Sequence, residues 1–273
     1  MRKLISGVLF ASLFFHLACS PRSNTDDGQK YVRGEELLLK ALRHFYFASY
    51  STQVQIDKVY SENFKTNDEM RMSGKYDGDH RKFMVQIKPG EKHKGRSVLV
   101  EGQGDKAIAA YTYSPGDKEV AKFNMGQVGG GGQTTADIVV GGLSFLDLQL
   151  LQGSLPRKRV SEEGTAEINS HSCYQLMIQY ADGYEYDHVQ FFATKDELLP
   201  VLLRIYDQKS AIIKEITFDK YDTVAGKSAV KVLIINDKVY GYTSNFTFGN
   251  TRIGDPIDDN IFTIENLKKG WGA

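Results

Sequence analysis

Few residues of the 273-residue chain have the types and the spacing that catalysis needs. His171 and Cys173 come closest to a base and a nucleophile, but their side chains lie side by side on a strand, and no partner orients the histidine. A half-buried thiol at the start of a strand is the simpler interpretation of Cys173. We therefore expect no catalytic nucleophile.

The nucleotide motifs are incomplete. The run VAGKS at 224–228 has Tyr221 where a phosphate loop requires its first glycine, so a hairpin turn is expected there. The run GQG at 102–104 lacks the third glycine of a dinucleotide site, and a strand pattern rather than a helix pattern follows it. The sequence therefore predicts no cofactor.

Metal ligands are also not grouped. The six histidines are scattered, and the acidic turn DPIDDN at 255–260 lacks the residue order and the distal glutamate of a calcium loop. We expect no metal and no enzyme activity. A hydrolase that uses His171, His188 or the acidic turn stays an alternative, and it requires two of these groups within hydrogen-bond reach in a cleft.

Charge and cysteine content exclude further classes. Lys and Arg number 34, Asp and Glu also number 34, and the formal net charge is +0, which argues against nucleic acid as a partner. Two cysteines cannot form a disulfide framework. The length and the apolar content suit one globular domain with a substantial core.

The N-terminus predicts export. Two basic residues, Arg2 and Lys3, precede an apolar run at 4–17 that is shorter than the roughly 20 residues needed to span a bilayer. The run ends in Ala18 and Cys19, and the segment resembles a bacterial lipoprotein signal, in which that cysteine is acylated and becomes the mature N-terminus. A plain secretory signal with Cys19 unmodified is the alternative.

This interpretation divides the chain into three parts: a lipoprotein signal peptide at 1–18, a lipidated N-terminus with a flexible linker at 19–32, and one domain at 33–273. Ser20 after the cysteine favours the outer over the inner membrane. The expected location is the bacterial cell envelope, on a lipid anchor that faces the periplasm.

The domain is expected to be mainly β, of the α+β class. Residues 34–48 have the apolar spacing of an amphipathic helix, and residues 143–151 predict a short central helix. Between and after them the pattern has period 2, and 155–172 reads as a loop with a weak strand. The twelve clearer strands are expected at 52–60, 69–76, 82–88, 97–101, 107–113, 119–125, 173–180, 188–193, 201–206, 212–221, 229–236 and 240–248. Short connections favour an antiparallel meander, and so many strands predict a strongly curled sheet, a half-open barrel capped by the two helices.

The apolar faces of the strands are candidates for the lining of a cavity. A curled sheet covered by so little helix is expected to leave a groove, although complete filling by the helices is an alternative. The candidate lining residues are Val54, Ile56, Val85, Ile87, Tyr111, Tyr113, Leu203, Ile205, Ile216, Phe218, Val232, Ile234 and Phe246. A glycine run, Gly129, Gly130, Gly131 and Gly132, is a candidate gating loop at the entrance.

Several short motifs, in this order, resemble the LolA-like outer-membrane lipoprotein-sorting proteins, a group that includes LolB and the RseB-type regulators. The similarity extends from about Leu37 to Lys269. The motifs are LSFLDL at 143–148, SCYQL at 172–176, LP at 199–200 with RIYD at 204–207, TFDKY at 217–221, and DDNIFT at 258–263.

The resemblance implies a half-open antiparallel barrel whose apolar cavity takes lipid acyl chains. The expected function is a membrane-anchored periplasmic protein that binds lipid or lipoprotein, in outer-membrane lipoprotein sorting or lipid transfer, without catalysis. An envelope sensor or assembly lipoprotein that binds a protein partner with the same fold is the alternative. Cys19 separates this chain from a soluble shuttle such as LolA and makes it more similar to an anchored receptor such as LolB.

Overall fold

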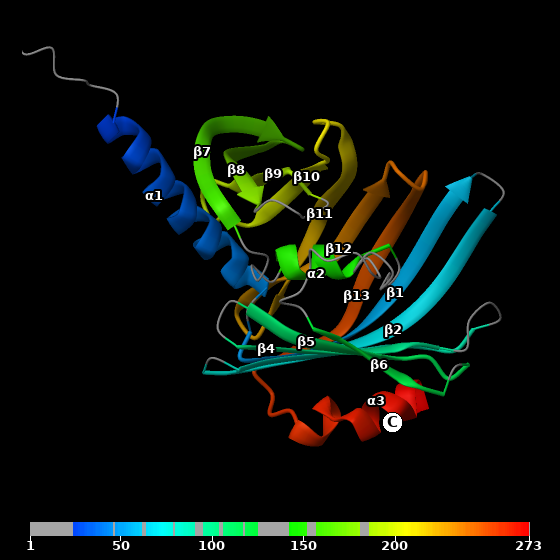
Figure 1. Cartoon of the computed structure of the whole chain (residues 1–273). Coiled ribbons are helices and arrows are strands. Elements are labelled where there is room, and N and C mark those ends of the chain that lie inside the picture. The colour runs from blue at the N-terminus through cyan, green and yellow to red at the C-terminus, as the bar shows by residue number, and fades with distance from the viewer. Residues whose placement is uncertain are drawn as a thin grey trace, which may run out of the picture.

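The computed structural model describes residues 24–45, 47–61, 64–78, 80–90, 95–103, 106–116, 118–124, 142–151, 157–180 and 186–272. One antiparallel sheet of thirteen strands dominates it (Figure 1). The strands of the first half are β1 (Ser49–Ser61), β2 (Phe64–Asp77), β3 (His80–Ile87), β4 (Ser97–Gln103), β5 (Lys106–Tyr113) and β6 (Val120–Asn124). Those of the second half are β7 (Arg157–Ile168), β8 (His171–Tyr180), β9 (His188–Thr194), β10 (Pro200–Tyr206), β11 (Ile212–Val224), β12 (Lys227–Asp237) and β13 (Tyr242–Ile253).

The strand order joins two meanders at their ends. It runs β6-β5-β4-β3-β2-β1-β13-β12-β11-β10-β9-β8-β7, so the first and last strands of the chain pair in the middle. That pairing matches Val54 with Phe248 and Ile56 with Phe246. Strands β6 and β7, which are consecutive along the chain, therefore lie at opposite edges of the sheet.

The expectation of a strongly curled, half-open barrel is wrong. The sheet is open, with β6 and β7 as separate edges. The reason is that helices, rather than closure of the sheet, cover its apolar face. Buried side chains from α1 (Asn24–Leu42) and α2 (Phe145–Leu151) join those of twelve strands in one hydrophobic cluster. The sheet thus buries its core without bringing its edges together.

The N-terminal helix begins ten residues earlier than expected. It starts at Asn24, so the described part of the expected flexible linker is helical. Tertiary contacts explain the difference, because Lys30 and Arg33 form ion pairs with β7, on Glu163 at 3.0 Å and Glu162 at 2.8 Å. Gly34 permits this close approach, since a Cβ there would lie 2.9 Å from the backbone of β7.

The remaining helices lie on the two faces of the sheet (Figure 1). The seven-residue α2 lies within the apolar segment 143–151 and buries Leu146 and Leu150 in the main cluster. A C-terminal helix, α3 (Ile264–Lys269), was not expected. It follows η4 (Asp259–Phe262) and buries Leu267 and Phe262 against Met84 and Leu99 on the opposite face.

The strand predictions are confirmed in location. Each of the twelve clearer strands overlaps an observed strand, and the segment expected to hold a weak strand contains the twelve-residue β7. Two expectations lie outside the described residues: the signal and lipidation segment around Cys19, and the gating loop at Gly129–Gly132. They stay predictions.

Candidate functional site

An apolar cavity of about 120 Å³ opens at one end of the core. It lies between α2, η1 (Arg43–Phe45) and the middle strands of the sheet. The lining side chains are mostly aromatic or aliphatic. They are His44, Phe45, Phe47, Tyr50, Thr52, Met72, Tyr76, Phe83, Leu143, Leu151, Phe218, Ala229, Val230, Leu233, Phe248 and Thr251.

The aromatic side chains of the wall touch one another. The ring centroids of Phe45 and Phe218 are 5.4 Å apart, which joins the end of the N-terminal helical segment to β11. Tyr50 stands between Phe47 and Phe83, with centroid distances of 6.2 Å to each. Such aromatic contacts favour a fixed wall over a mobile one.

A glycine on β2 makes room for Tyr50. A Cβ at Gly74 would lie 2.1 Å from a ring atom of Tyr50, and real Cβ atoms do not approach so closely. Burial raises the pKa of Tyr50 well above its ordinary value of 10.0, and nearby Tyr76 adds to the shift. Tyr50 is therefore a neutral part of the wall at every physiological pH.

The rim of the cavity is partly exposed at His44, Tyr76 and Thr251. The Nε2 atom of His44 lies 3.0 Å from the carbonyl oxygen of Glu197, and because that oxygen can only accept, His44 donates from Nε2. None of the described lining residues is Asp, Glu, Lys or Arg. The cavity therefore suits an apolar ligand group better than a charged one.

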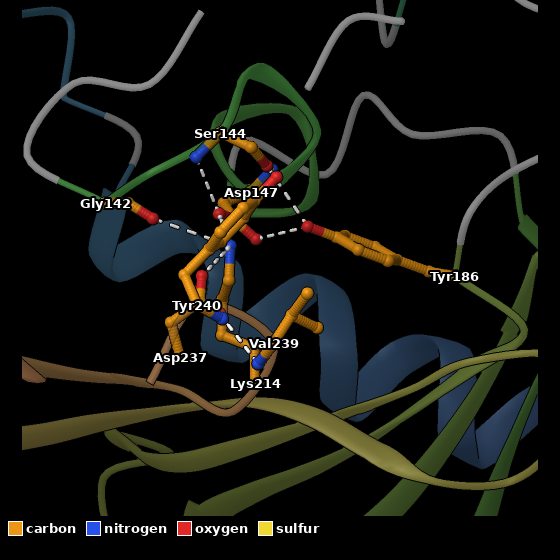
Figure 2. Close-up of polar contacts among 8 residues, drawn as sticks. All are labelled: Gly142, Ser144, Asp147, Tyr186, Lys214, Asp237, Val239 and Tyr240. Atoms are coloured by element: carbon orange, nitrogen blue, oxygen red, sulfur yellow. Dashed lines mark hydrogen bonds and ion pairs between the residues drawn. The ribbon is translucent and has the colours of Figure 1, made fainter. Parts of the chain in front are cut away.

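A buried polar cluster holds α2 in place (Figure 2). Ser144 and Asp147 form a reciprocal cap, in which the Ser144 nitrogen donates to Asp147 Oδ2 at 2.7 Å and the Asp147 nitrogen donates to Ser144 Oγ at 3.1 Å. Tyr186 donates its hydroxyl proton to Asp147 Oδ1 at 2.7 Å. Lys214 on β11 donates to Asp147 Oδ2 at 2.6 Å.

Lys214 also connects α2 to the turn after β12. Its Nζ lies 3.8 Å from Asp237 Oδ2 and 3.5 Å from the Gly142 carbonyl oxygen. Oδ1 of Asp237 accepts from the backbone nitrogens of Val239 and Tyr240, at 3.0 Å each. The acids are thus used in holding α2 and a turn, and Asp147 is fully buried. This arrangement positions a helix rather than activating a substrate.

The residues predicted to line the cavity lie on two different faces of the sheet. Most are buried in the main core, but of the thirteen only Phe218 lines the cavity. Residues buried in that core are Val54, Ile56, Val85, Leu203, Ile205, Ile216, Phe218 and Phe246, with Ile87 partly buried against it. These positions share the face on which the cavity lies.

The other four predicted residues are on the opposite face. Tyr111 and Tyr113 pack against α3 and η4. Val232 and Ile234 are only partly buried, whereas their neighbours Leu233 and Ile235 are buried in the main core. The predicted orientation was wrong on β5 and β12, because both faces of these strands are apolar and periodicity does not distinguish them.

Sequence reasoning also missed most of the wall. The segment 44–52 supplies five lining residues where the chain passes from helix to strand. Neither the helical nor the strand periodicity of apolar residues identifies such a junction. The one signal was the density of aromatic residues in HFYFASY at 44–50. The LSFLDL motif did mark α2, although not the role of its aspartate.

The groups required by the hydrolase alternative are not brought together. His171 begins β8, whereas His188 lies beside Gln179 near the other end of that strand. His188 is stacked on Tyr206 and lies 2.7 Å from Asp187 Oδ2, while Asp259 in the acidic turn pairs with Lys75. The geometric condition for that alternative is not met.

The described residues also bear on other classes of site. No group of three or more His, Cys, Asp or Glu side chains is placed to hold a metal ion within the described ranges. Among the described helices, none is long and apolar enough to cross a membrane.

Solved structures that share this fold include three from different bacteria. A DUF1329 family protein from Desulfovibrio piger has a TM-score of 0.75 at 16% identity, over 87% of this chain and 99% of that one. A putative outer membrane lipoprotein-sorting protein domain from Vibrio parahaemolyticus has a TM-score of 0.74 at 15% identity, with the same coverage. A LolA superfamily protein from Nitrosomonas europaea has a TM-score of 0.66 at 15% identity, over 85% of this chain and 98% of that one.

The sequence also matches a protein-family model. No curated protein matches the chain. A family model described as "-like: Uncharacterized protein" matches residues 78–269, which is more than half of the chain. The chain belongs to that family of uncharacterized proteins, and its fold is LolA-like.

Proposed function

We propose that this protein is a periplasmic lipid- or lipoprotein-binding protein, held at the membrane by a lipid on Cys19, and that its cavity takes an acyl chain without catalysis. The observation that carries the proposal is the cavity itself, whose described lining contains no Asp, Glu, Lys or Arg. The fold shared with a putative lipoprotein-sorting domain supports it.

The energetics favour a chain-like ligand. Each methylene removed from water contributes about 0.8 kcal/mol, so about five buried methylenes at the end of a chain would contribute about 4 kcal/mol. A polar ligand would instead lose hydrogen bonds to water on entering a wall of Phe, Tyr, Leu and Val side chains, and few groups there replace them.

The size of the cavity adds a constraint. A volume of about 120 Å³ is comparable to an engineered cavity of ~150 Å³ that binds benzene. It therefore holds the end of a chain. A longer chain extends through the mouth or displaces α2, whose flanking residue Leu143 and last residue Leu151 form part of the wall.

Two tryptophan variants on β12 test whether the cavity binds an acyl chain. Val230 lines the cavity, whereas Val232, two residues along the same strand, is similarly half-buried and does not. The full chain is purified from membranes, and its bound lipids are measured by native mass spectrometry. It is then titrated with a fluorescent fatty acid.

The parent and Val232→Trp should carry lipid and bind the fatty acid equally. Val230→Trp should bind at least about tenfold more weakly, because displacing two methylenes from the cavity already costs about 1.6 kcal/mol. Equal binding by both variants would exclude the cavity as the site. A parent free of lipid that binds no fatty acid, yet retains an envelope protein, would favour the alternative of a protein-binding function.

A further inference from the structure

Large exposed apolar side chains gather at the end of the sheet away from the cavity. Seven such side chains are exposed in the described part of the chain, and two of these, Val32 and Leu39, lie on α1. The other five are Tyr60 (41% exposed), Phe64 (47%), Ile212 (37%), Val239 (62%) and Tyr240 (68%). We call these five the hairpin-end surface.

Strand pairing brings these five together. Tyr60 lies at the end of β1 and Phe64 at the start of β2, and Val239 and Tyr240 lie in the turn between β12 and β13. The end of β1 lies beside the start of β13, since Val59 pairs with Thr243. Ile212 starts β11, and the next residue accepts a 2.9 Å hydrogen bond from the Lys238 nitrogen.

The aromatic members form a contiguous group around Tyr242. The ring of Tyr60 lies 5.1 Å from Phe64 and 5.4 Å from Tyr242, and Tyr240 is stacked on Tyr242 at 6.2 Å. The Lys58 ammonium sits 3.7 Å from the centroid of Tyr242. Exposed apolar residues scattered singly are ordinary, but a contiguous group of this kind marks an interaction surface.

The composition matches the interface of a bilayer. Tyrosine side chains are enriched where an apolar region meets water, because the ring enters the apolar region while the hydroxyl stays hydrated. Four lysines lie at the same strand ends: Lys58 on β1, Lys65 on β2, Lys209 before β11 and Lys238 after β12. Of these, Lys58 contacts the aromatic rings and Lys238 pairs with Glu215 at 3.4 Å. Lysine stems extend along apolar surface and leave the ammonium among anionic headgroups.

We propose that the hairpin-end surface docks onto the surface of a bilayer that contains anionic lipid. Tyr50 at the cavity and Tyr60 at this surface are ten residues apart on β1, which corresponds to about 33 Å. Docking therefore leaves the cavity at the end of the sheet that is remote from the bilayer. In the view of Figure 1, the N-terminal end of α1 and the ends of β1 and β12 lie along the same upper side, so a lipid anchor before α1 is compatible with this orientation.

Two single-cysteine additions to the full chain test the orientation. Val239→Cys places a label in the hairpin-end surface, and Thr223→Cys places one on an exposed site near the opposite end of β11. Each variant is labelled with bimane and bound to vesicles of phosphatidylcholine and phosphatidylglycerol that carry a doxyl quencher on the lipid. The parent chain, treated identically, corrects for label on the native cysteines.

The bimane label at position 239 should be quenched, and its emission should shift to the blue. The label at position 223 should show neither change. Replacing Tyr60, Phe64 and Tyr240 by Ser should abolish quenching at 239, and vesicles of phosphatidylcholine alone should reduce it.

Quenching at 239 no greater than at 223, or unchanged by the three serines, would overturn the proposal. A partner protein as the true occupant would give that same unquenched result on protein-free vesicles. The cavity test with Val230→Trp is independent, so the two proposals fail separately.

Discussion

The Nζ atom of Lys214 lies 2.6 Å from Oδ2 of Asp147, and this ion pair joins β11 to α2 across 67 positions of the sequence. Both side chains are buried, Asp147 fully. The helix that this pair holds buries Leu146 and Leu150 in the main core and contributes Leu151 to the cavity wall. This buried contact therefore contributes to holding α2 over the sheet.

Lys214→Met should destabilise the protein by about 3 kcal/mol. Removing one partner of a buried ion pair leaves the other charge without compensation, which typically costs about 3–5 kcal/mol. Tyr186 and the Ser144 nitrogen would still donate to Asp147 and limit the loss. Chemical denaturation measures the free energy of unfolding.

The matched control is Lys231→Met. Lys231 pairs with Asp222 at 3.0 Å, but both side chains are well exposed, so the change should cost less than about 1 kcal/mol. Equal losses for the two variants would show that the contact between Lys214 and Asp147 has no special role in stability.

Gly74→Ala should weaken both the fold and ligand binding. The added methyl group would lie 2.1 Å from the ring of Tyr50, which must then move within the cavity wall. Overpacking of this kind costs about 1–3 kcal/mol. Thermal unfolding and titration with the fluorescent fatty acid measure the two effects.

Gly249→Ala provides the comparison, because a methyl group added there would lie 4.0 Å from its nearest neighbour, the carbonyl oxygen of Gln53. This variant should behave like the parent in both measurements. If Gly74→Ala also behaved like the parent, Tyr50 would not have a fixed position in the wall.

Some of this architecture follows from sequence and some does not. Alternation predicted the strands because turns such as Gly226 punctuate them. It did not predict which side chains of β12 face the core, because residues 232–235 are all apolar. Nor did it predict the pairing of β1 with β13. The role of Asp147 depends on Lys214, which is far away in sequence, so no local pattern reveals it.

The Cys173 thiol should react slowly with iodoacetamide in the folded protein. Burial raises the pKa of Cys173, and the negative charge of Glu167 raises it further, so the reactive thiolate is scarce near neutral pH. Phe192, Val201 and Leu202 also cover the side chain. A cysteine introduced at exposed Thr165 should react more than about tenfold faster. Similar rates for the two cysteines would show that Cys173 is accessible.

Acid should weaken the attachment of α1 to β7. A hydrogen bond from Ser161, and then the contact with Lys30, hold the pKa of Glu163 below its ordinary value of 4.5. A carboxylate whose folded pKa is lowered stabilises the fold above the ordinary value, and this contribution is lost as the pH falls through the lowered one. Because the side chain is about one-third exposed, the effect should be below about 1 kcal/mol.

Glu163→Gln should remove that part of the pH dependence. The measurement is the free energy of unfolding at pH values on either side of the ordinary carboxyl pKa, for the parent and the variant. Glu167→Gln, at another exposed position on β7, should leave the dependence unchanged. An identical acid response in the parent and in Glu163→Gln would contradict this assignment.

Photo-crosslinking tests the central claim, that the cavity holds an acyl chain, most directly. The full chain is loaded with a fatty acid that carries a diazirine at the end of its chain, irradiated, and mapped by mass spectrometry. The account predicts adducts on cavity peptides, at 44–52 and 229–233, in the parent and in Val232→Trp, and their loss in Val230→Trp. Adducts confined to the hairpin-end surface, or adducts on the cavity peptides that persist in Val230→Trp, would contradict it.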